Sequence, residues 1–93
     1  LHIQAVATSQ ASEDQARELG IPIIPFDQIG RLDVTIDGAD EVNEQLVLVK
    51  GGGGALLSEK IVERNSDRLI IIVAESKDVK VLGAFPLPVE VVP

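Results

Sequence analysis

The sequence predicts an α/β fold in which helices flank a parallel sheet. Segments rich in Ile and Val alternate with segments of helix-forming residues, a pattern typical of parallel strands joined by right-handed crossover connections. Ile and Val supply 22 of the 93 residues (10 Ile and 12 Val), whereas the aromatic residues are limited to two phenylalanines. An aliphatic, β-branched core favours buried parallel strands over a helix bundle.

The first third of the chain contains one predicted strand and one predicted helix. The apolar run at 3–8 predicts a buried strand. Ser12 and Gln15 have the spacing of a capping box, which predicts a helix from this point that ends before Gly20. Prolines interrupt residues 21–26, so this stretch is predicted to be an edge strand or an extended connection.

The rest of the chain continues the alternation. Four further strands are predicted, over residues 32–36, 45–49, 69–74 and 89–92. A turn rich in Gly and Asp at 37–41 follows the first of them, and a polar loop at 75–78 follows the third. Residues 55–65 are mostly good helix formers and predict a helix directly after a run of glycines.

Residues 1–93 are expected to form a single partial domain. A chain of this length builds one small core and buries roughly two-thirds of the surface that its unfolded form exposes. The chain opens on Leu1 and a hydrophobic stretch, and it closes on another hydrophobic stretch at 89–92. We therefore expect it to be the central part of a longer protein.

The charge balance and the missing cysteines exclude several classes of function. Fifteen acidic residues against eight basic ones give a formal net charge of -7, which disfavours nucleic acid and anionic membranes as partners. The absence of cysteine excludes disulfide frameworks and thiolate chemistry. No apolar run approaches the roughly 18 residues of a membrane helix, and no signal peptide opens the chain, so we expect a cytoplasmic protein.

Polar side chains gather where predicted strands end. Asp37, Asp40 and Glu41 follow one strand, Lys50 follows the next, and Lys77 follows a third. In open parallel sheets the ligand crevice lies beyond the carboxyl ends of the strands, so we expect these three loops to converge. The two aspartates flank a tight turn, where they could bind a metal or sugar hydroxyls, act as an acid/base pair, or simply stabilise the turn.

The run of four glycines from Gly51 to Gly54 is the sharpest local feature. Consecutive glycines before a helix are useful mainly where a ligand approaches the backbone closely, and their N–H groups favour an anion. The run lacks the spacing of the dinucleotide-binding fingerprint, and Lys50 precedes the glycines, unlike the lysine of a P-loop. A flexible surface loop is the alternative.

Glu59 lies on the predicted helix in line with Ala55 and Val62, on an otherwise apolar stripe. Glu63, four residues further on, carries a like charge, so pairing along the helix surface does not explain Glu59. A partly buried carboxylate has a raised pKa and suits a general base that works near neutral pH. The alternative is a solvated surface glutamate.

Four linked segments carry the most specific pattern. In order they read Val-Thr-Ile-Asp-Gly-Ala-Asp-Glu at 34–41, Lys-Gly-Gly-Gly-Gly-Ala-Leu-Leu-Ser-Glu-Lys at 50–60, Ala-Glu-Ser-Lys at 74–77 and Gly-Ala-Phe-Pro-Leu-Pro-Val-Glu-Val-Val-Pro at 83–93. With them the chain resembles the type A ribose-5-phosphate isomerase family over nearly its whole length. The resemblance implies a Rossmann-like fold, similar to that of the CoA transferases and incomplete here, because family members carry further segments on both sides.

That resemblance implies an aldose–ketose isomerase of the pentose phosphate pathway, which interconverts ribose 5-phosphate and ribulose 5-phosphate through an enediolate without metal or cofactor. By this likeness Glu59 is the general base, Asp37 assists ring opening, and Lys50 stabilises the oxyanion. The other substrate-binding residues implied are Gly38, Ala39, Asp40, Gly51, Gly52, Gly53 and Lys77. Asp40 would bind hydroxyls and Lys77 the phosphate end, in a cytoplasmic homodimer or tetramer.

Other functions remain open on the residues alone. A non-catalytic sugar-phosphate sensor of the same fold has no need of a carboxylate at Glu59. A metal-dependent hydrolase would use Asp37, Asp40 and Glu41 as oxygen ligands. CoA transfer on a related scaffold also uses a glutamate. Because part of the family's phosphate grip lies outside these segments, we expect the 93 residues alone to have little or no activity.

Overall fold

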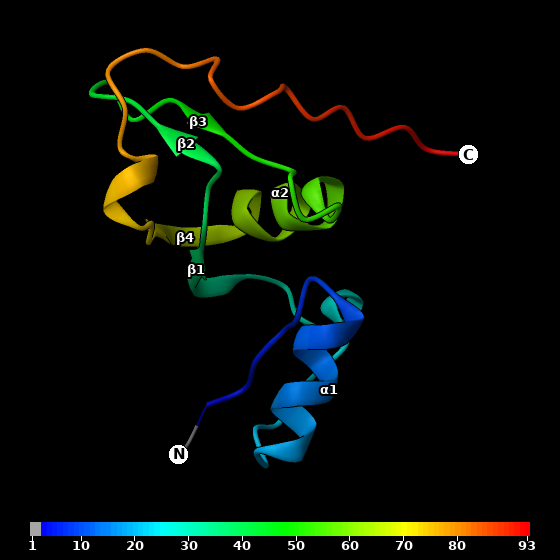
Figure 1. Ribbon diagram of the computed structural model, residues 1–93. Helices are drawn as coiled ribbons and strands as arrows, with labels where there is room; N and C mark the ends of the chain where they lie inside the picture. Colours follow the sequence, from blue (N-terminus) through cyan, green and yellow to red (C-terminus); the bar gives the residue numbers. More distant parts are fainter. Residues whose placement is uncertain (1–2) are drawn as a thin grey trace.

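The structure is a computed structural model that describes residues 3–93, and it confirms the predicted α/β class. The elements in chain order are α1 (Gln10–Glu18), the 3₁₀ turn η1 (Phe26–Gln28), β1 (Leu32–Asp37), β2 (Glu41–Val42), β3 (Leu48–Val49), α2 (Leu56–Arg64), β4 (Ser66–Ile71) and the 3₁₀ turn η2 (Glu75–Lys77). In Figure 1 the extended segment after η2 passes over the hairpin of β2 and β3 and continues past α2.

Strands β1 and β4 form the parallel sheet that the sequence predicts. They pair from Leu32 and Ser66 at one end to Asp37 and Ile71 at the other. The chain between them passes through the β2–β3 hairpin and then α2, which packs on both strands. Strand β4 covers residues 66–71, earlier than the predicted 69–74, because it starts almost directly after the helix.

Strands β2 and β3 are antiparallel, which corrects two expectations. The run at 45–49 shrinks to a two-residue strand, and Glu41, expected in a turn, begins β2. Asn43 makes the reversal, because its side-chain oxygen accepts hydrogen bonds from the backbone N–H groups of Gln45 and Val47. A reversal of this kind returns the chain beside itself, so the two strands pair antiparallel.

Helix α1 begins earlier than the capping-box pattern predicted. Its N-cap is Ser9, whose hydroxyl accepts a hydrogen bond from the N–H of Ser12 at 3.2 Å. Ser12 is therefore inside the helix, and the capping box assigned to Ser12 and Gln15 is wrong. The predicted stop is confirmed, since Gly20 follows the C-cap with φ of 74°, a conformation that suits glycine.

Neither of the two terminal strands forms. Residues 3–8 contribute a single bridge from Ala5 to Ile23, which agrees with the extended connection expected at 21–26. Residues 89–92 are extended but have no strand partner among residues 3–93, and Val91 is 81% exposed. A strand exists only when another strand accepts its hydrogen bonds, so hydrophobic character alone did not suffice.

The core is small and lies next to the hairpin and α2. Its buried hydrophobic residues among those described are Ala39, Val49 and Val62. The accessible surface is 7005 Å², whereas a compact protein of this mass exposes about 5200 Å². The expectation that two-thirds of the surface would be buried is therefore wrong. Within residues 3–93 no helix is both long enough and apolar enough to span a membrane.

Candidate active site

A pocket of about 190 Å³ lies where β1 ends, between the glycine run and the start of α2. It is lined by Asp37, Gly38, Ala39, Asp40, Lys50, Gly51, Gly52, Gly53, Glu59 and Lys77. The catalytic and substrate-binding residues implied by the family resemblance therefore all line one pocket, whereas Glu41 does not. The three loops converge as predicted, but Lys50 follows β3 of the antiparallel hairpin and not a strand of the parallel sheet.

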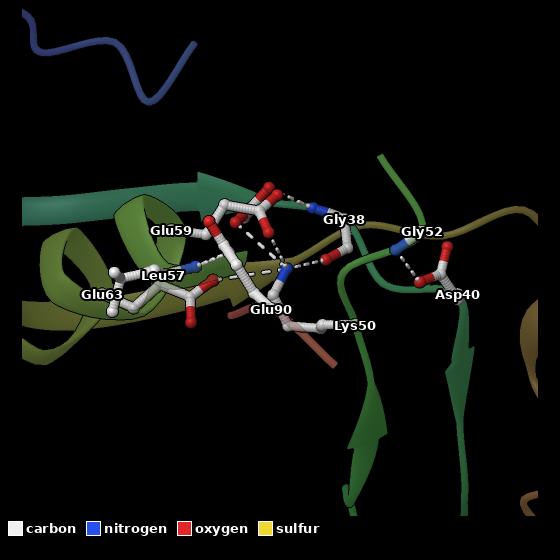
Figure 2. A network of polar contacts seen from close by, with 9 residues as sticks. Gly38, Asp40, Lys50, Gly52, Leu57, Glu59, Glu63 and Glu90 are labelled. Atoms are coloured by element: carbon white, nitrogen blue, oxygen red, sulfur yellow. Dashed lines mark hydrogen bonds and ion pairs between the residues drawn. The ribbon is translucent and has the colours of Figure 1, made fainter. Parts of the chain in front are cut away.

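Lys50 is the centre of the site's polar contacts (Figure 2). Its Nζ lies 3.1 Å from Asp37 Oδ2, 3.8 Å from Glu59 Oε2 and 3.4 Å from Glu63 Oε1. Nζ also donates a hydrogen bond to the carbonyl oxygen of Gly38. The Lys50 side chain is only 10% exposed, so these interactions are only partly screened by water.

The contacts between Lys50 and its carboxylate neighbours raise the pKa of Lys50 and lower that of Asp37. Burial opposes the charged form of Lys50, but its acidic neighbours outweigh burial and raise the Lys50 pKa. Burial likewise acts to raise the pKa of Asp37. The Glu63 carboxyl, the Gly38 N–H and Lys50 outweigh it, so the Asp37 pKa lies below its ordinary value. Both partners therefore remain charged near neutral pH.

Glu59 is a partly buried carboxylate at the start of α2. It lies in the first turn of α2, and its side chain is 19% exposed. Burial raises the pKa of Glu59; Lys50 opposes that effect, whereas Asp37, Asp40 and Glu90 add to it. The sequence argument for a partly buried carboxylate with a raised pKa agrees with this geometry. At this exposure Glu59 is partly buried and is not a fully solvated surface residue.

Glu63 is a member of the cluster that the sequence did not assign to the site. It lies one helical turn after Glu59, so both carboxylates reach Lys50 from the same face of α2 (Figure 2). Its Oε1 is buried and has no hydrogen-bond partner in the described structure. Burial and the neighbouring Asp37 raise the Glu63 pKa. The signal available in the sequence was the i, i+4 spacing from Glu59.

We expect Glu63→Gln to change the pH dependence of stability. A carboxyl whose pKa is raised by folding contributes stability below its unfolded pKa, and that contribution is lost as pH rises through the folded value. Glutamine does not titrate, so the variant should gain on the wild type in free energy of unfolding as pH rises from 4 to 8. Urea unfolding at several pH values measures this, and a pH-independent difference would contradict it.

Two of the four glycines are required by close packing. A Cβ on Gly52 would lie 2.7 Å from Asp40 Oδ1 and 2.8 Å from Phe85 Cζ. A Cβ on Gly51 would lie 3.0 Å from Pro88 Cβ, and Gly51 also has a φ of 104°. Gly54 has open space around its Cβ position, but its φ of 82° is a conformation that favours glycine. Gly51 and Gly52 are thus packed against other parts of the chain, whereas Gly53 and Gly54 are open.

The glycine N–H groups are only partly available to a ligand. Gly52 donates to Asp40 Oδ2 at 2.8 Å, and Gly54 donates to the carbonyl of Gly51. The glycine run in the sequence predicts that these donors face an anion. In the structure Asp40 occupies the Gly52 donor, whereas the Cβ position of Gly53 faces open space. Gly53 is therefore the loop residue whose backbone a ligand approaches most easily.

Gly52→Ala is expected to destabilise the protein and Gly53→Ala is not. The added methyl group at position 52 must displace Asp40 or Phe85, which costs about 1–3 kcal/mol by analogy with overpacked cores. The same change at position 53 meets no atom within 4 Å, so it should stay within about 0.5 kcal/mol of the wild type. Thermal unfolding of both variants provides the comparison. Equal losses at the two positions would rule this packing argument out.

Lys77 and Glu41, the two other charged residues expected at the strand ends, differ in their positions relative to the pocket. Lys77 lies in η2 and reaches the pocket because the next residue, Asp78, bridges to Val42 of the hairpin. Glu41 lies away from the pocket: it is 4% exposed and accepts a hydrogen bond from the N–H of Gly83 at 3.0 Å. Asp37, Asp40 and Glu41 therefore do not converge as the metal-ligand set of a hydrolase. No group of three acidic, His or Cys side chains in residues 3–93 has that arrangement.

Comparison with known proteins places this geometry in a family. Residues 4–93 match the family described as ribose 5-phosphate isomerase A (phosphoriboisomerase A). A ribose-5-phosphate isomerase A from Sphingopyxis alaskensis is 59% identical to this chain over an alignment that covers 100% of this chain and 41% of the relative. The ribose-5-phosphate isomerase A from Bacillus mycoides is also 59% identical, over 99% of this chain and 42% of the relative. The chain thus spans about two-fifths of the length of these relatives.

Solved structures agree with the sequence comparison. The ribose 5-phosphate isomerase A of Neisseria gonorrhoeae superposes with a TM-score of 0.86 at 47% identity, over 89% of this chain and 37% of that one. A D-ribose-5-phosphate isomerase in complex with phospho-erythronic acid gives a TM-score of 0.85 at 44% identity, over 88% and 36% of the two chains. The sequence match and the shared fold lead to one conclusion: the chain belongs to the ribose 5-phosphate isomerase A family.

Proposed function

We propose that these 93 residues form the catalytic centre of a longer protein that interconverts ribose 5-phosphate and ribulose 5-phosphate. One observation carries the proposal: the Glu59 and Asp37 carboxylates both contact the Lys50 ammonium, in a pocket that the glycine loop helps to line. An aldose–ketose isomerisation needs a base, a second group for proton movement at oxygen, and a positive charge for the intermediate. The pocket supplies all three.

Glu59 is the proposed base. Its carboxylate takes the proton from C2 of the open-chain aldose, and the electrons of that C–H bond form the C1–C2 double bond of the enediolate as charge moves onto O1. Return of the proton to C1, with formation of the C2 carbonyl, gives the ketose. The raised pKa of Glu59 supports this role, because a base is most effective when its pKa approaches the working pH.

Lys50 and Asp37 are proposed to act on the sugar oxygens. The Lys50 pKa is raised, so the ammonium is charged when negative charge develops on the enediolate oxygen. Asp37 is 3.1 Å from Lys50 Nζ and remains ionised. It is therefore suited to accept the O2 proton, deliver it to O1 and assist opening of the sugar ring.

The substrate-binding residues extend from this centre along the pocket. We propose that Asp40 and the backbone of Gly38 and Ala39 contact the sugar hydroxyls, while Gly51, Gly52 and Gly53 line the path of the reacting carbons. Lys77 supplies positive charge for the phosphate end. The solved relative that holds phospho-erythronic acid supports a phosphorylated sugar as the ligand.

Location and assembly are proposals taken from the family resemblance. We propose that the protein is cytoplasmic and that the full-length form is a homo-oligomer, a dimer or a tetramer. The exposed apolar side chains around the sheet, such as Ile36 and Ile72, support further contacts beyond these 93 residues. The isolated 93 residues are expected to show little or no turnover, because part of the family's phosphate grip lies outside them.

The deciding experiment is conversion of ribose 5-phosphate by the full-length protein in EDTA, with substrate binding measured in parallel. Turnover that survives EDTA supports the metal-free isomerase. Loss of turnover in EDTA favours a metal-dependent enzyme. Binding of the sugar phosphate without any turnover would replace the isomerase with a sensor.

A further inference from the structure

The segment from Gly83 to Glu90 contacts elements that build the pocket. It begins where the Gly83 N–H donates to the buried Glu41. Phe85 then fills the space beside Gly52, and Pro88 fills the space beside Gly51. These contacts hold the segment against the hairpin and the glycine loop, and Glu90 adds a hydrogen bond to Leu57 of α2. Figure 1 shows the path of this segment across the hairpin and past α2.

Helix α2, which carries Glu59, has no cap from its own sequence. Its N-cap is Ala55, which has no side chain able to accept a hydrogen bond. The free N–H of Leu57 instead donates to Oε2 of Glu90 at 2.6 Å, across 33 residues of sequence (Figure 2). A carboxylate at this end of a helix both satisfies the orphan donor and interacts favourably with the helix dipole.

We propose that Glu90 is a positioning residue for Glu59, holding the first turn of α2 so that the Glu59 carboxylate stays beside Lys50. The inference rests on the proposed function, in which Glu59 is the base. Glu59 comes only two residues after Leu57, whose N–H donates to Glu90. The Glu59 Oε2 atom lies 3.8 Å from Lys50 Nζ. Displacing a catalytic base by about 1 Å lowers the reaction rate strongly. The position of this helical turn therefore affects the rate of the proposed reaction.

Charge gives Glu90 a signature that a purely structural cap lacks. The titratable groups that act on Glu59 are Lys50, Asp37, Asp40 and Glu90, and Glu63 joins through its contact with Lys50. The negative charge of Glu90 raises the pKa of Glu59. Removing that charge should lower the Glu59 pKa, so the acidic limb of the pH profile of kcat/KM should move to lower pH.

Two substitutions in the full-length protein test the inference. Glu90→Gln keeps an oxygen acceptor but loses the charge, so kcat should stay within about threefold while the acidic limb of the pH profile moves to lower pH. Glu90→Ala removes the acceptor as well, so kcat should fall by about 10- to 100-fold with KM changed far less. Glu18→Gln, on α1 outside the pocket, removes one charge as the matched control and should leave both kcat and the profile unchanged.

The outcomes separate this inference from the proposed function. A folded Glu90→Ala variant with wild-type kcat and pH profile would overturn the positioning role. If Glu90→Ala does not fold, the Glu90→Gln profile decides, and an unmoved acidic limb counts against the role. Failure of the wild type to isomerise ribose 5-phosphate instead removes the proposed function on which the inference rests.

Discussion

Replacing Glu59 with glutamine is expected to lower kcat for ribose 5-phosphate by about 10²–10⁴-fold, the contribution of a positioned general base. Glutamine keeps the size of the side chain but cannot accept the C2 proton. Asp37 and Glu63 remain beside Lys50, so the ammonium keeps two of its three carboxylate partners and the fold is preserved. KM should therefore change by only a few fold.

Steady-state kinetics of the full-length Glu59→Gln protein in EDTA measure this effect, with binding of ribose 5-phosphate followed separately. Glu18→Gln serves as the control for loss of one negative charge outside the pocket. An activity within tenfold of the wild type would remove Glu59 from the role of base. Intact binding with lost turnover would leave the proposed mechanism standing.

Replacing Lys50 with methionine should produce the second large effect, on both activity and stability. Activity should fall by about 10²–10³-fold, comparable to the loss of one oxyanion donor. Stability at neutral pH should fall by up to about 3 kcal/mol, the lower end of the cost of breaking a fully buried ion pair, because this cluster is partly exposed. The three carboxylates grouped around Lys50 Nζ would lose their shared counter-charge.

The stability loss in Lys50→Met should depend on pH in a defined direction. Without the ammonium, repulsion raises the folded-state pKa of Asp37, Glu59 and Glu63. Groups raised in this way contribute stability at low pH and lose it as pH rises through their folded pKa. The variant should therefore approach wild-type stability near pH 4 and fall furthest below it near pH 8.

Urea unfolding of Lys50→Met across this pH range provides the measurement. Lys60→Met, on the exposed side of α2, is the matched control and should cost little at any pH. Adding Glu63→Gln to Lys50→Met should restore part of the stability and none of the activity. A loss of stability that is the same at pH 4 and pH 8 would contradict the cluster electrostatics.

Local patterns predicted the elements whose formation depends on neighbouring residues. Helix α2 lies within the predicted range 55–65, because good helix formers follow a glycine run. Strand β1 extends the predicted range by one residue, and Gly20 ends α1 as expected. The same patterns placed the N-cap of α1 at Ser12 instead of Ser9, because two nearby serines offer similar side-chain oxygens.

Elements that depend on a distant partner were predicted less well. The apolar stretch at 89–92 forms no strand, because no other strand in the described structure accepts its hydrogen bonds. The run at 45–49 pairs antiparallel with β2, because the Asn43 turn sends it back beside the chain that it has just left. Composition indicates that a segment is apolar, but it does not determine which strand that segment pairs with.

The sequence by itself determined the α/β class, the family and the residue types of the site, because these depend on periodicity and on short motifs such as the glycine run after Lys50. Tertiary structure alone decided which charges meet. Glu63 reaches Lys50 because of helical register, and Glu90 reaches Leu57 across 33 residues. The contact between Glu63 and Lys50 affects the pKa values of the cluster, and the contact between Glu90 and Leu57 caps α2. Both depend on distances of a few ångströms that exist only after the chain has folded.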